Sequence, residues 1–387
     1  MPSVPTTSLD LTAPEVVADP YPFFAEERAR HGVAWHEASG MYLTFAHATV
    51  GAVQRDRRLG RLWRDKEPLD YLEPFNLLHR NQMMENEPPE HARLRRPVAS
   101  AFSRGHVERL RPRVRELAAG LLAEVDPAGF DVVGEYAEPL PVLVIAELLG
   151  VPAVHAPELR DWSQAIVRMY EAAPSEAVVD AAVRAATDFA ALVRDLVTHR
   201  RAHPGDDLVT DLVATELTED EVVAAVVLLL NAGHEASVNV FGNGLVSMLQ
   251  RGLRPGPDVP ACVEEMLRFD SALQLFERTA TEDVEVGDVV VEKGQKIAAL
   301  LGAANRDPAV FKDPDDFDVA RAANPHLAFG VGVHFCLGAP LARMELAESV
   351  AALWGRFPDL ALAGEPVSRG TFVLRGYHSV PVEGSLG

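Results

Sequence analysis

The stretch Phe329-Gly330-Val331-Gly332-Val333-His334-Phe335-Cys336-Leu337-Gly338-Ala339-Pro340-Leu341-Ala342-Arg343 is the strongest signal in this chain. Three glycines surround Cys336, and glycine lets a loop take positive φ values and bring backbone N–H groups close to a ligand. A helix beginning near Leu337 would supply the dipole and the donors that stabilise a thiolate. The alternative is a buried, inert thiol, which is the expectation for Cys262 on the predicted helix 261–269.

Composition indicates a globular protein that works without nucleic acid or membrane. The 387 residues are 48% hydrophobic and 24% charged, and the formal net charge is −21, which repels nucleic acid and anionic lipid. The longest apolar run, Val222 to Leu230, is about half of what spans a bilayer. The N-terminus has no basic and apolar leader, and two cysteines make no disulfide framework. We therefore expect a soluble, cytoplasmic protein.

The patterning predicts a mainly α protein with a small β-rich region. Short alternating segments, from Ala29 to Val53 with a turn at Ser39-Gly40 and from Val284 to Ile297, predict two small sheets. No repeat or linker divides the chain, so residues 1–387 are expected to form one domain. Long helices are predicted over Val107–Glu124, Val142–Leu149, Glu176–Arg201 and Glu219–Gln250.

The last of these helices carries a polar interruption. It starts with a capping box at Thr218 and Glu221, and runs apolar until residues 231–237, Asn-Ala-Gly-His-Glu-Ala-Ser. Gly233 costs about 1 kcal/mol relative to alanine inside a helix, which suggests that something approaches the backbone closely. A ligand and a neighbouring helix are both open as the cause.

The pattern Phe-Gly-x-Gly-x-His-x-Cys-x-Gly-x-x-Leu-Ala-Arg resembles the haem-binding signature of cytochromes P450. The resemblance implies the P450 fold and a haem b whose iron takes the Cys336 thiolate as its axial ligand. It also implies that the loop around the cofactor includes Phe329, Gly330 and Gly338.

Further matches follow in the family's order. Glu265 and Arg268, three residues apart on one helical face, resemble the family's structural Glu-x-x-Arg pair, with Arg321 as the expected third partner. The resemblance also implies cationic or hydrogen-bonding contacts to the two haem propionates, from His91, Arg95, Arg278 and His334.

The segment from Ala232 to Ser237 is similar to the family's oxygen-binding segment, where an acid is followed by threonine. There the acid and the alcohol hold water and pass protons toward the oxygen that is being reduced. Glu235 retains the acid, but Ala236 stands at the threonine position. Proton delivery is then left to Ser237, to a water, or to a polar group of the substrate itself.

The resemblance implies a monooxygenase that uses dioxygen and two external electrons to oxidise, by hydroxylation in the simplest case, a small hydrophobic or aromatic-bearing metabolite in bacterial specialised metabolism. The chain lacks a Gly-x-Gly-x-x-Gly fingerprint, so ferredoxin and ferredoxin reductase are the expected electron donors. The arginines between Arg93 and Arg115 are a candidate ferredoxin dock, with a solvated helix surface as the alternative. Radical coupling, peroxide-driven oxidation and a non-catalytic haem-thiolate sensor remain open. Substrate contacts are expected from Leu62 to Met84, Trp162 to Pro174, Leu229 to Ala236, Ala272 to Phe276 and Phe372 to Gly376.

Overall fold

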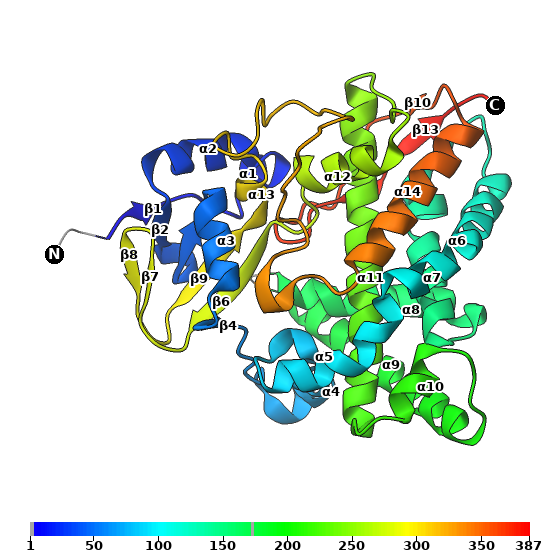
Figure 1. The fold of residues 1–387 in the computed structure, drawn as a ribbon, viewed down its shortest axis with the longest axis horizontal. Coiled ribbons are helices and arrows are strands. Elements are labelled where there is room, and N and C mark those ends of the chain that lie inside the picture. The colour runs from blue at the N-terminus through cyan, green and yellow to red at the C-terminus, as the bar shows by residue number, and fades with distance from the viewer. Residues whose placement is uncertain (1–3, 172–173) are drawn as a thin grey trace.

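Helices make up most of the molecule. The computed structural model describes residues 4–171 and 174–387. Most of its helices gather on one side, away from the main sheet (Figure 1). They are α4 (Leu69–Arg80), α5 (Glu90–Ala99), α6 (Arg104–Glu124), α7 (Pro139–Leu149), α8 (Ala156–Val167), α9 (Glu176–Ala202), α10 (Leu208–Val213), α11 (Glu219–Gln250), α12 (Val259–Phe269) and α14 (Ala339–Arg356).

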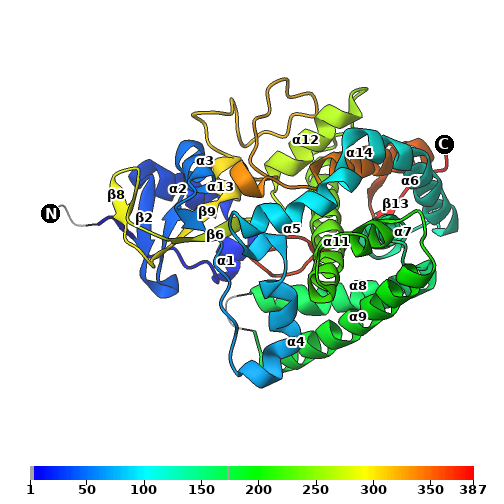
Figure 2. The same cartoon turned by 60° about the horizontal axis from the view of Figure 1, so that its bottom comes forward.

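Helix α11 runs through the centre of this bundle and contacts α4, α7, α8, α9, α12 and α14 (Figures 1 and 2). The predicted capping box is present: Thr218 Oγ1 accepts from the Glu221 N–H at 3.3 Å, and the Glu221 carboxylate accepts from the Thr218 N–H at 2.8 Å. Among the described residues, α11 is the one helix long and apolar enough to cross a membrane. Because 78% of its apolar window is buried inside the protein, it has the character of a core helix.

The polar segment of α11 does not break the helix, which continues from Asn231 through Ser237. A Cβ placed on Gly233 would lie 3.0 Å from Cγ1 of Ile145 on α7. The close approach that Gly233 predicted is therefore made by a neighbouring helix. The glycine is needed because α7 packs against this turn of α11.

The β-rich region is built on a six-stranded sheet of order β1-β2-β3-β9-β6-β4. Gly40, at φ +61°, makes the predicted turn between β2 and β3, which pair antiparallel. The strands are β1 (Thr6–Thr7), β2 (Val33–His36), β3 (Met41–Thr44), β4 (Leu59–Gly60), β6 (Leu275–Ala280) and β9 (Lys296–Leu300), accompanied by α1 (Pro14–Ala18), α2 (Tyr21–Arg30), α3 (His47–Arg55) and α13 (Leu301–Ala304).

Smaller sheets complete the β structure. Strands β7 (Val284–Val286) and β8 (Val289–Val291) form a hairpin that turns at Gly287 with φ +59°, within the second small sheet predicted over Val284 to Ile297, whose last residues belong to β9. The others are the set β5 (Phe130–Asp131), β10 (Ala361–Leu362) and β13 (Pro381–Glu383), and the pair β11 (Val367–Ser368) and β12 (Tyr377–Ser379). The predicted class, mainly α with a small β-rich region, is confirmed, while the single domain over residues 1–387 stays a prediction.

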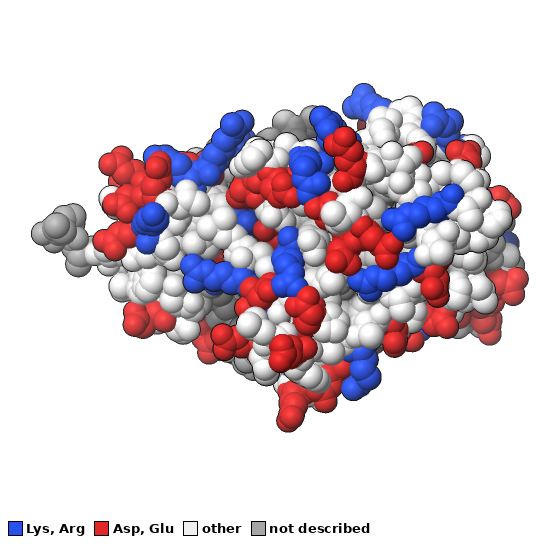
Figure 3. Space-filling model, turned by 90° about the horizontal axis from the view of Figure 1, so that it is seen from below, with Lys and Arg blue, Asp and Glu red and all other residues white. Residues whose placement is uncertain are grey.

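The predicted basic face on α5 and α6 is largely neutralised by the chain's own carboxylates. On the side of the molecule seen in Figure 3, basic side chains lie beside acidic ones. Among the described residues, Arg95, Arg96, Arg104 and Arg109 make no ion pair with a carboxylate, whereas the other four of the eight arginines do. The ion pairs are Arg93 with Glu90 and Glu221, Arg111 with Glu108 and Glu348, Arg113 with Glu116 and Glu147, and Arg115 with Glu348.

Candidate active site

Glycines shape the loop of residues 329–338 that leads into α14. Gly330 and Gly332 have φ values of +65° and +81°, in the left-handed region that side chains disfavour. A Cβ on Gly332 would lie 2.6 Å from the backbone oxygen of Gln54 on α3. The Gln54 side chain in turn accepts from the Val331 N–H at 2.8 Å. The loop can therefore close on α3 only with glycine at position 332.

Cys336 ends this loop, just before α14 begins. Its N–H donates to the carbonyl of Phe329 at 2.9 Å. Burial raises the pKa of the Cys336 thiol, while the backbone N–H groups of Gly338 and Ala339 and the guanidinium of Arg95 act to lower it. Two backbone donors and a cation thus face the sulfur, which is the environment of a ligating thiolate. Gly338 leaves room beside it, since a Cβ there would lie 4.0 Å from Sγ.

Cys262 is different. It is fully buried on α12 and its thiol contacts Met248 Sδ at 3.5 Å. Burial raises the pKa of this thiol to about 12. It is the inert core cysteine that its sequence surroundings predicted.

The four predicted propionate contacts lie around the Cys336 loop. The rings of His91 on α5 and His334 in the loop meet edge-on at 4.5 Å between centroids. Arg95 Nη2 donates to the carbonyl of Phe335 at 2.7 Å. Arg278 on β6 is 3% exposed and donates to the carbonyl of Glu277 at 3.0 Å. Burial lowers the pKa of Arg278 to about 10 and that of His91 to about 4.

Three charged residues that sequence reasoning missed complete this region. Glu87 accepts from the Arg61 backbone N–H at 2.7 Å and from His334 Nε2 at 2.8 Å. The Arg61 guanidinium forms an ion pair with Glu85. Burial raises the pKa of Glu87, but these hydrogen bonds and the charges of His334 and Arg278 outweigh it and hold the pKa below its usual value. Glu87 therefore bonds directly to His334, while the Arg278 charge acts on it without an ion pair.

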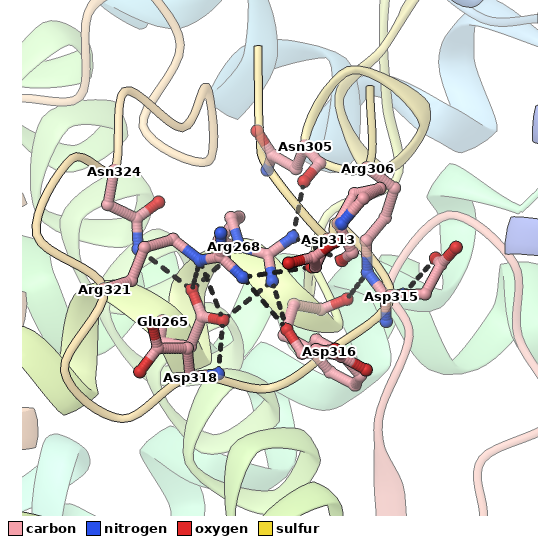
Figure 4. A network of polar contacts seen from close by, with 12 residues as sticks. Glu265, Arg268, Asn305, Arg306, Asp313, Asp315, Asp316, Asp318, Arg321 and Asn324 are labelled. Carbon is pink, nitrogen blue, oxygen red and sulfur yellow. Dashed lines mark hydrogen bonds and ion pairs between the residues drawn. The ribbon is translucent and has the colours of Figure 1, made fainter. Parts of the chain in front are cut away.

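A buried ion network anchors the irregular segment before the loop (Figure 4). Glu265 accepts two hydrogen bonds from Arg268 at 2.7 and 2.8 Å, and both side chains are fully buried. Arg321 Nε donates to the same carboxylate at 3.0 Å. Removing one partner of such a buried pair costs about 3–5 kcal/mol. Arg268 also donates to the backbone carbonyls of Asn305, Pro314 and Asp316 at 2.9, 2.8 and 3.1 Å.

Glu235 lies on α11 with 2% of its surface exposed. Its Oε2 accepts from Arg369 Nη1 at 2.7 Å, while Oε1 is buried and accepts no hydrogen bond from the described residues. Burial raises the pKa of Glu235, and the Arg369 guanidinium opposes this rise. His234 Nδ1 is 3.6 Å from Oε1, but burial lowers the pKa of His234 to about 3, so the imidazole is neutral.

Small residues open one face of α11 next to this acid. Between Val222 and Met248, the residues that are not buried are Ala232, Gly233 and Ala236. Ala232 and Ala236 are four apart and share a face. The helix thus presents a strip without bulky side chains beside Glu235.

Ser237 has a partner on α14. Its hydroxyl hydrogen-bonds to the carboxyl of Glu345, a fully buried residue that sequence reasoning missed. Burial raises the pKa of Glu345 to about 8, so the carboxyl is protonated at neutral pH. Ser237 therefore faces a different side of α11 from Ala236.

A small cavity brings together three of the five predicted substrate-contacting segments. His79 Nε2 lies 3.2 Å from the Tyr170 hydroxyl. Gln82 Oε1 and Asn231 Oδ1 are buried without a hydrogen bond from residues 4–171 or 174–387. Residues 172–173 of the segment Trp162 to Pro174 lie outside the described residues. The lining residues are Leu78, His79, Gln82, Tyr170, Ala224, Val227, Leu228 and Asn231.

Comparisons with known proteins decide the family. Residues 257–358 match the family described as Cytochrome P450. The chain is 40% identical over 371 residues to nocardicin C N-oxygenase of Nocardia uniformis subsp. tsuyamanensis, covering 91% of each protein. The chain belongs to the cytochrome P450 family. The 6-deoxyerythronolide B hydroxylase of Saccharopolyspora erythraea is 36% identical to this P450, over 97% of the chain and 99% of the hydroxylase.

The structure of P450BioI in complex with an acyl carrier protein ligated to hexadec-9Z-enoic acid superposes on this P450 with a TM-score of 0.91. The two are 31% identical, over 96% of this chain and 99% of that one. This likeness confirms the predicted P450 fold. The named relatives are oxygenases and hydroxylases, so the chain is a P450 monooxygenase of the bacterial secondary-metabolism kind. Bacterial P450s generally take their electrons from ferredoxin and reductase partners.

The residues of this P450 fit the family's haem, whose iron is ligated by a cysteine thiolate. Arg278 is a buried cation without an ion pair among the described residues, and His91 Nε2 is buried without a hydrogen-bond partner there. Both are groups that an anionic carboxylate would satisfy. The open strip on α11 and the donors around the Cys336 sulfur fit a flat group held by a thiolate.

Proposed function

We propose that this P450 inserts an oxygen atom from dioxygen into a small hydrophobic or aromatic-bearing metabolite of bacterial specialised metabolism, most simply by hydroxylation. The observation that carries the proposal is the buried acid Glu235 beside the open strip at Ala232 and Ala236. A buried ionisable group next to a strip of small residues on a core helix is the arrangement of a proton-transfer site. A non-catalytic haem-thiolate sensor does not need an acid that transfers protons. The hydroxylase and oxygenase names of the relatives support the same reaction class.

The haem is held, in this proposal, by Cys336 as the axial ligand and by His91, Arg95, Arg278 and His334 at its propionates. Phe329, Gly330 and Gly338 belong to the loop that surrounds the thiolate. The network of Glu265, Arg268 and Arg321 holds that loop in place without touching the reaction. When bound, the haem activates dioxygen with electrons supplied from outside, and the thiolate donates charge to the iron.

Glu235 is the group that holds and passes a proton. Ala236 supplies no hydroxyl, and the hydrogen bond from Ser237 to Glu345 turns that hydroxyl toward α14. Both observations favour a polar hydrogen of the bound substrate, or a water that it holds, as the last donor. The substrate then takes part in its own oxidation.

The cavity is too small to hold a whole substrate, so its lining describes only one part of the substrate site, and that part favours an apolar group that carries at least one hydrogen-bonding atom. Leu78, Val227 and Leu228 supply apolar contact, whereas the amides of Gln82 and Asn231 can each bond to a hydroxyl or amide of a ligand. A substrate that lacked such a group would leave the two amides buried and unpaired.

The electron donors are proposed to be a ferredoxin and its reductase, meeting this P450 in the cytoplasm. Arg96, Arg104 and Arg109 are exposed and make no ion pair with the chain's described carboxylates. An acidic ferredoxin could pair with these three cations without breaking existing contacts. We therefore take these three arginines, instead of all those between Arg93 and Arg115, as the docking face.

A reconstituted system tests the reaction. Metabolites made by neighbouring genes are first screened for a spectral shift of the ferric protein. Those that bind are then turned over with ferredoxin, reductase, NADPH and isotopically labelled dioxygen. We expect a product heavier than the substrate by one labelled oxygen atom. A product that has lost hydrogen without gaining labelled oxygen indicates oxidative coupling, which the missing alcohol at Ala236 also permits. Turnover that peroxide alone supports indicates the peroxide-driven route. NADPH consumption that no metabolite changes would favour the sensor.

A further inference from the structure

Arg369 joins three parts of the fold at the proposed proton-transfer acid. It follows β11 and donates from Nε to the carbonyl of Tyr377 on β12 at 3.2 Å. Its Nη1 reaches Glu235 on α11 at 2.7 Å and its Nη2 reaches Glu138, which precedes α7, at 3.1 Å. The ion-pair partners are 3% and 14% exposed at their side chains, so Glu138 is the end nearer to solvent.

One guanidinium is thus shared between two carboxylates. Burial raises the pKa of both Glu138 and Glu235, the Arg369 charge lowers both, and the Glu235 charge further raises the pKa of Glu138. Arg369 is the one guanidinium that both carboxylates share by hydrogen bonds, so the pair takes up a proton more readily than two acids that each had such a partner. Their protonation depends on where Arg369 sits.

Other charged groups face this pair from the neighbouring elements. Arg168, after α8, acts on Glu235, while Arg160 on α8 acts on Glu138 and on His234. Gln164 Nε2 donates to Glu138 at 3.1 Å. None of these makes a hydrogen bond to Glu235, so Arg369 is the cation in direct contact with the acid.

We propose that Arg369 is a positioning residue that holds Glu235 by its Oε2, leaves Oε1 free of hydrogen bonds from the described residues, and sets when Glu235 takes up a proton. With the ion pair formed, Glu235 is an anion. When Arg369 shifts to Glu138 alone, Glu235 gains one proton, and it releases that proton when the pair forms again. This inference rests on the proposed function, because it assigns a control to the same acid.

The test is the pH titration of Glu235 in the substrate-free ferric holoprotein. The infrared C=O stretch of its protonated carboxyl is identified as the band that Glu235→Gln removes. Arg369→Gln keeps a polar side chain but removes the charge, so the midpoint of the band should rise by about one pH unit or more. Arg369→Lys should return it toward the parent value. Glu138→Gln should lower the midpoint, because it removes a like charge.

Arg375→Gln is the matched control. Arg375 lies on the same C-terminal segment, is 14% exposed at its side chain against 12% for Arg369, and pairs with Asp270 instead of Glu235. It should leave the Glu235 band in place. The inference is overturned if Arg369→Gln leaves the midpoint unchanged, or if Arg375→Gln moves it equally.

Turnover separates this inference from the proposed function. If the band shifts as expected but no metabolite is oxidised, the proposed function fails and the role of Arg369 in setting the charge of Glu235 stands. If metabolites are oxidised, Arg369→Gln should also release several-fold more peroxide per NADPH than the parent protein. Equal peroxide release would remove Arg369 from proton delivery.

Discussion

At Cys336, the surroundings of the sulfur decide what the thiol can do. Two backbone N–H groups and Arg95 act on Cys336, whereas Cys262 meets only apolar atoms and a buried carboxylate that raises its pKa further. The two cysteines of one chain thus occupy opposite environments. The glycines around Cys336 were the sequence feature that separated them.

Replacing Cys336 by serine or histidine should abolish the thiolate signature, because neither oxygen nor imidazole donates charge to iron as sulfur does. The reduced carbon monoxide complex should lose its red-shifted Soret band. Cys262→Ala is the control, and it should keep that band while costing about 1 kcal/mol of stability through a lost buried contact. A Cys336→Ser protein that retained the red-shifted band would have another ligand.

Restoring the alcohol by Ala236→Thr tests whether the substrate supplies the missing hydrogen bond. The added hydroxyl should raise coupling for poor substrate analogues, and its bulk on the open strip should weaken binding of the true substrate. Peroxide released per NADPH consumed is measured for parent and variant, with the true substrate and with analogues. If the parent is as uncoupled with its true substrate as with analogues, substrate-assisted proton delivery is wrong.

The sequence alone could indicate the functional residues of α11, but not the distant residues that contact them. Glu235, Ala236 and Ser237 could be found in sequence because they are adjacent, but the partners of the first and last could not. Arg369 is 134 positions from Glu235, and Glu345 is on another helix. Such contacts depend on how elements pack, and no periodicity or spacing in one chain encodes them.

Among the elements, α5 and α6 show how packing changes the meaning of a charge run. Arg111 and Arg115 both pair with Glu348 on α14, so these arginines fasten α6 to the helix that follows the Cys336 loop. The sequence predicted a basic face from eight arginines with one carboxylate among them. The tertiary structure brings further carboxylates to that face, and among the described residues it leaves Arg96, Arg104 and Arg109 as the exposed arginines without an ion pair.

The double variant Arg104→Glu, Arg109→Glu should slow electron transfer from an acidic ferredoxin by about tenfold at low ionic strength, with a weaker salt dependence than the parent. Substrate binding should be unchanged. Lys293→Glu, Lys312→Glu is the matched control, because both lysines are exposed and the net charge changes equally. Rates are measured by rapid mixing of reduced ferredoxin with the ferric protein. Equal slowing in the two variants would attribute the effect to net charge instead of a docking face.

Element boundaries that depend on neighbouring residues were predicted correctly from the sequence. The Thr218 cap gave the start of α11, and Ser39-Gly40 gave the turn between β2 and β3, since both depend on residues close in sequence. The close approach predicted at Gly233 is made by Ile145 of α7, which is the neighbouring-helix alternative, and α11 continues through this position. The sequence indicated that a group approaches the backbone at Gly233, but it could not show whether that group was a ligand or a neighbouring helix.

For the whole molecule, two carboxyls whose pKa values shift in opposite directions, Glu264 and Glu345, make stability depend on pH. Burial raises the pKa of Glu264 on α12, but hydrogen bonds from His326 and Arg343 outweigh it and bring the pKa to about 2. Its stabilising contribution is therefore present above the pKa of the unfolded chain and is lost as the pH falls toward about 2. Glu345 behaves in the reverse sense, since burial raises its pKa to about 8.

The consequence of Glu345 is a loss of stability toward alkaline pH. Between its ordinary value, 4.5, and about 8, the folded protein keeps a proton that the unfolded chain has released. The free energy of unfolding therefore falls as the pH rises through this window. Glu345→Gln mimics the protonated carboxyl and should be similar to the parent near pH 5, but more stable by on the order of a few kcal/mol near pH 9.

Chemical denaturation of the holoprotein, followed by haem absorbance and circular dichroism across that range, measures the difference. Glu264→Gln is the opposing control, because it should lower stability throughout the neutral range instead of raising it at alkaline pH. Were the parent and Glu345→Gln to lose stability in parallel from about pH 5 to about pH 9, Glu345 would titrate as an ordinary carboxyl. The contact between Ser237 and Glu345 would then join an ionised acid to α11, and α14 would carry a buried charge next to the proposed haem loop.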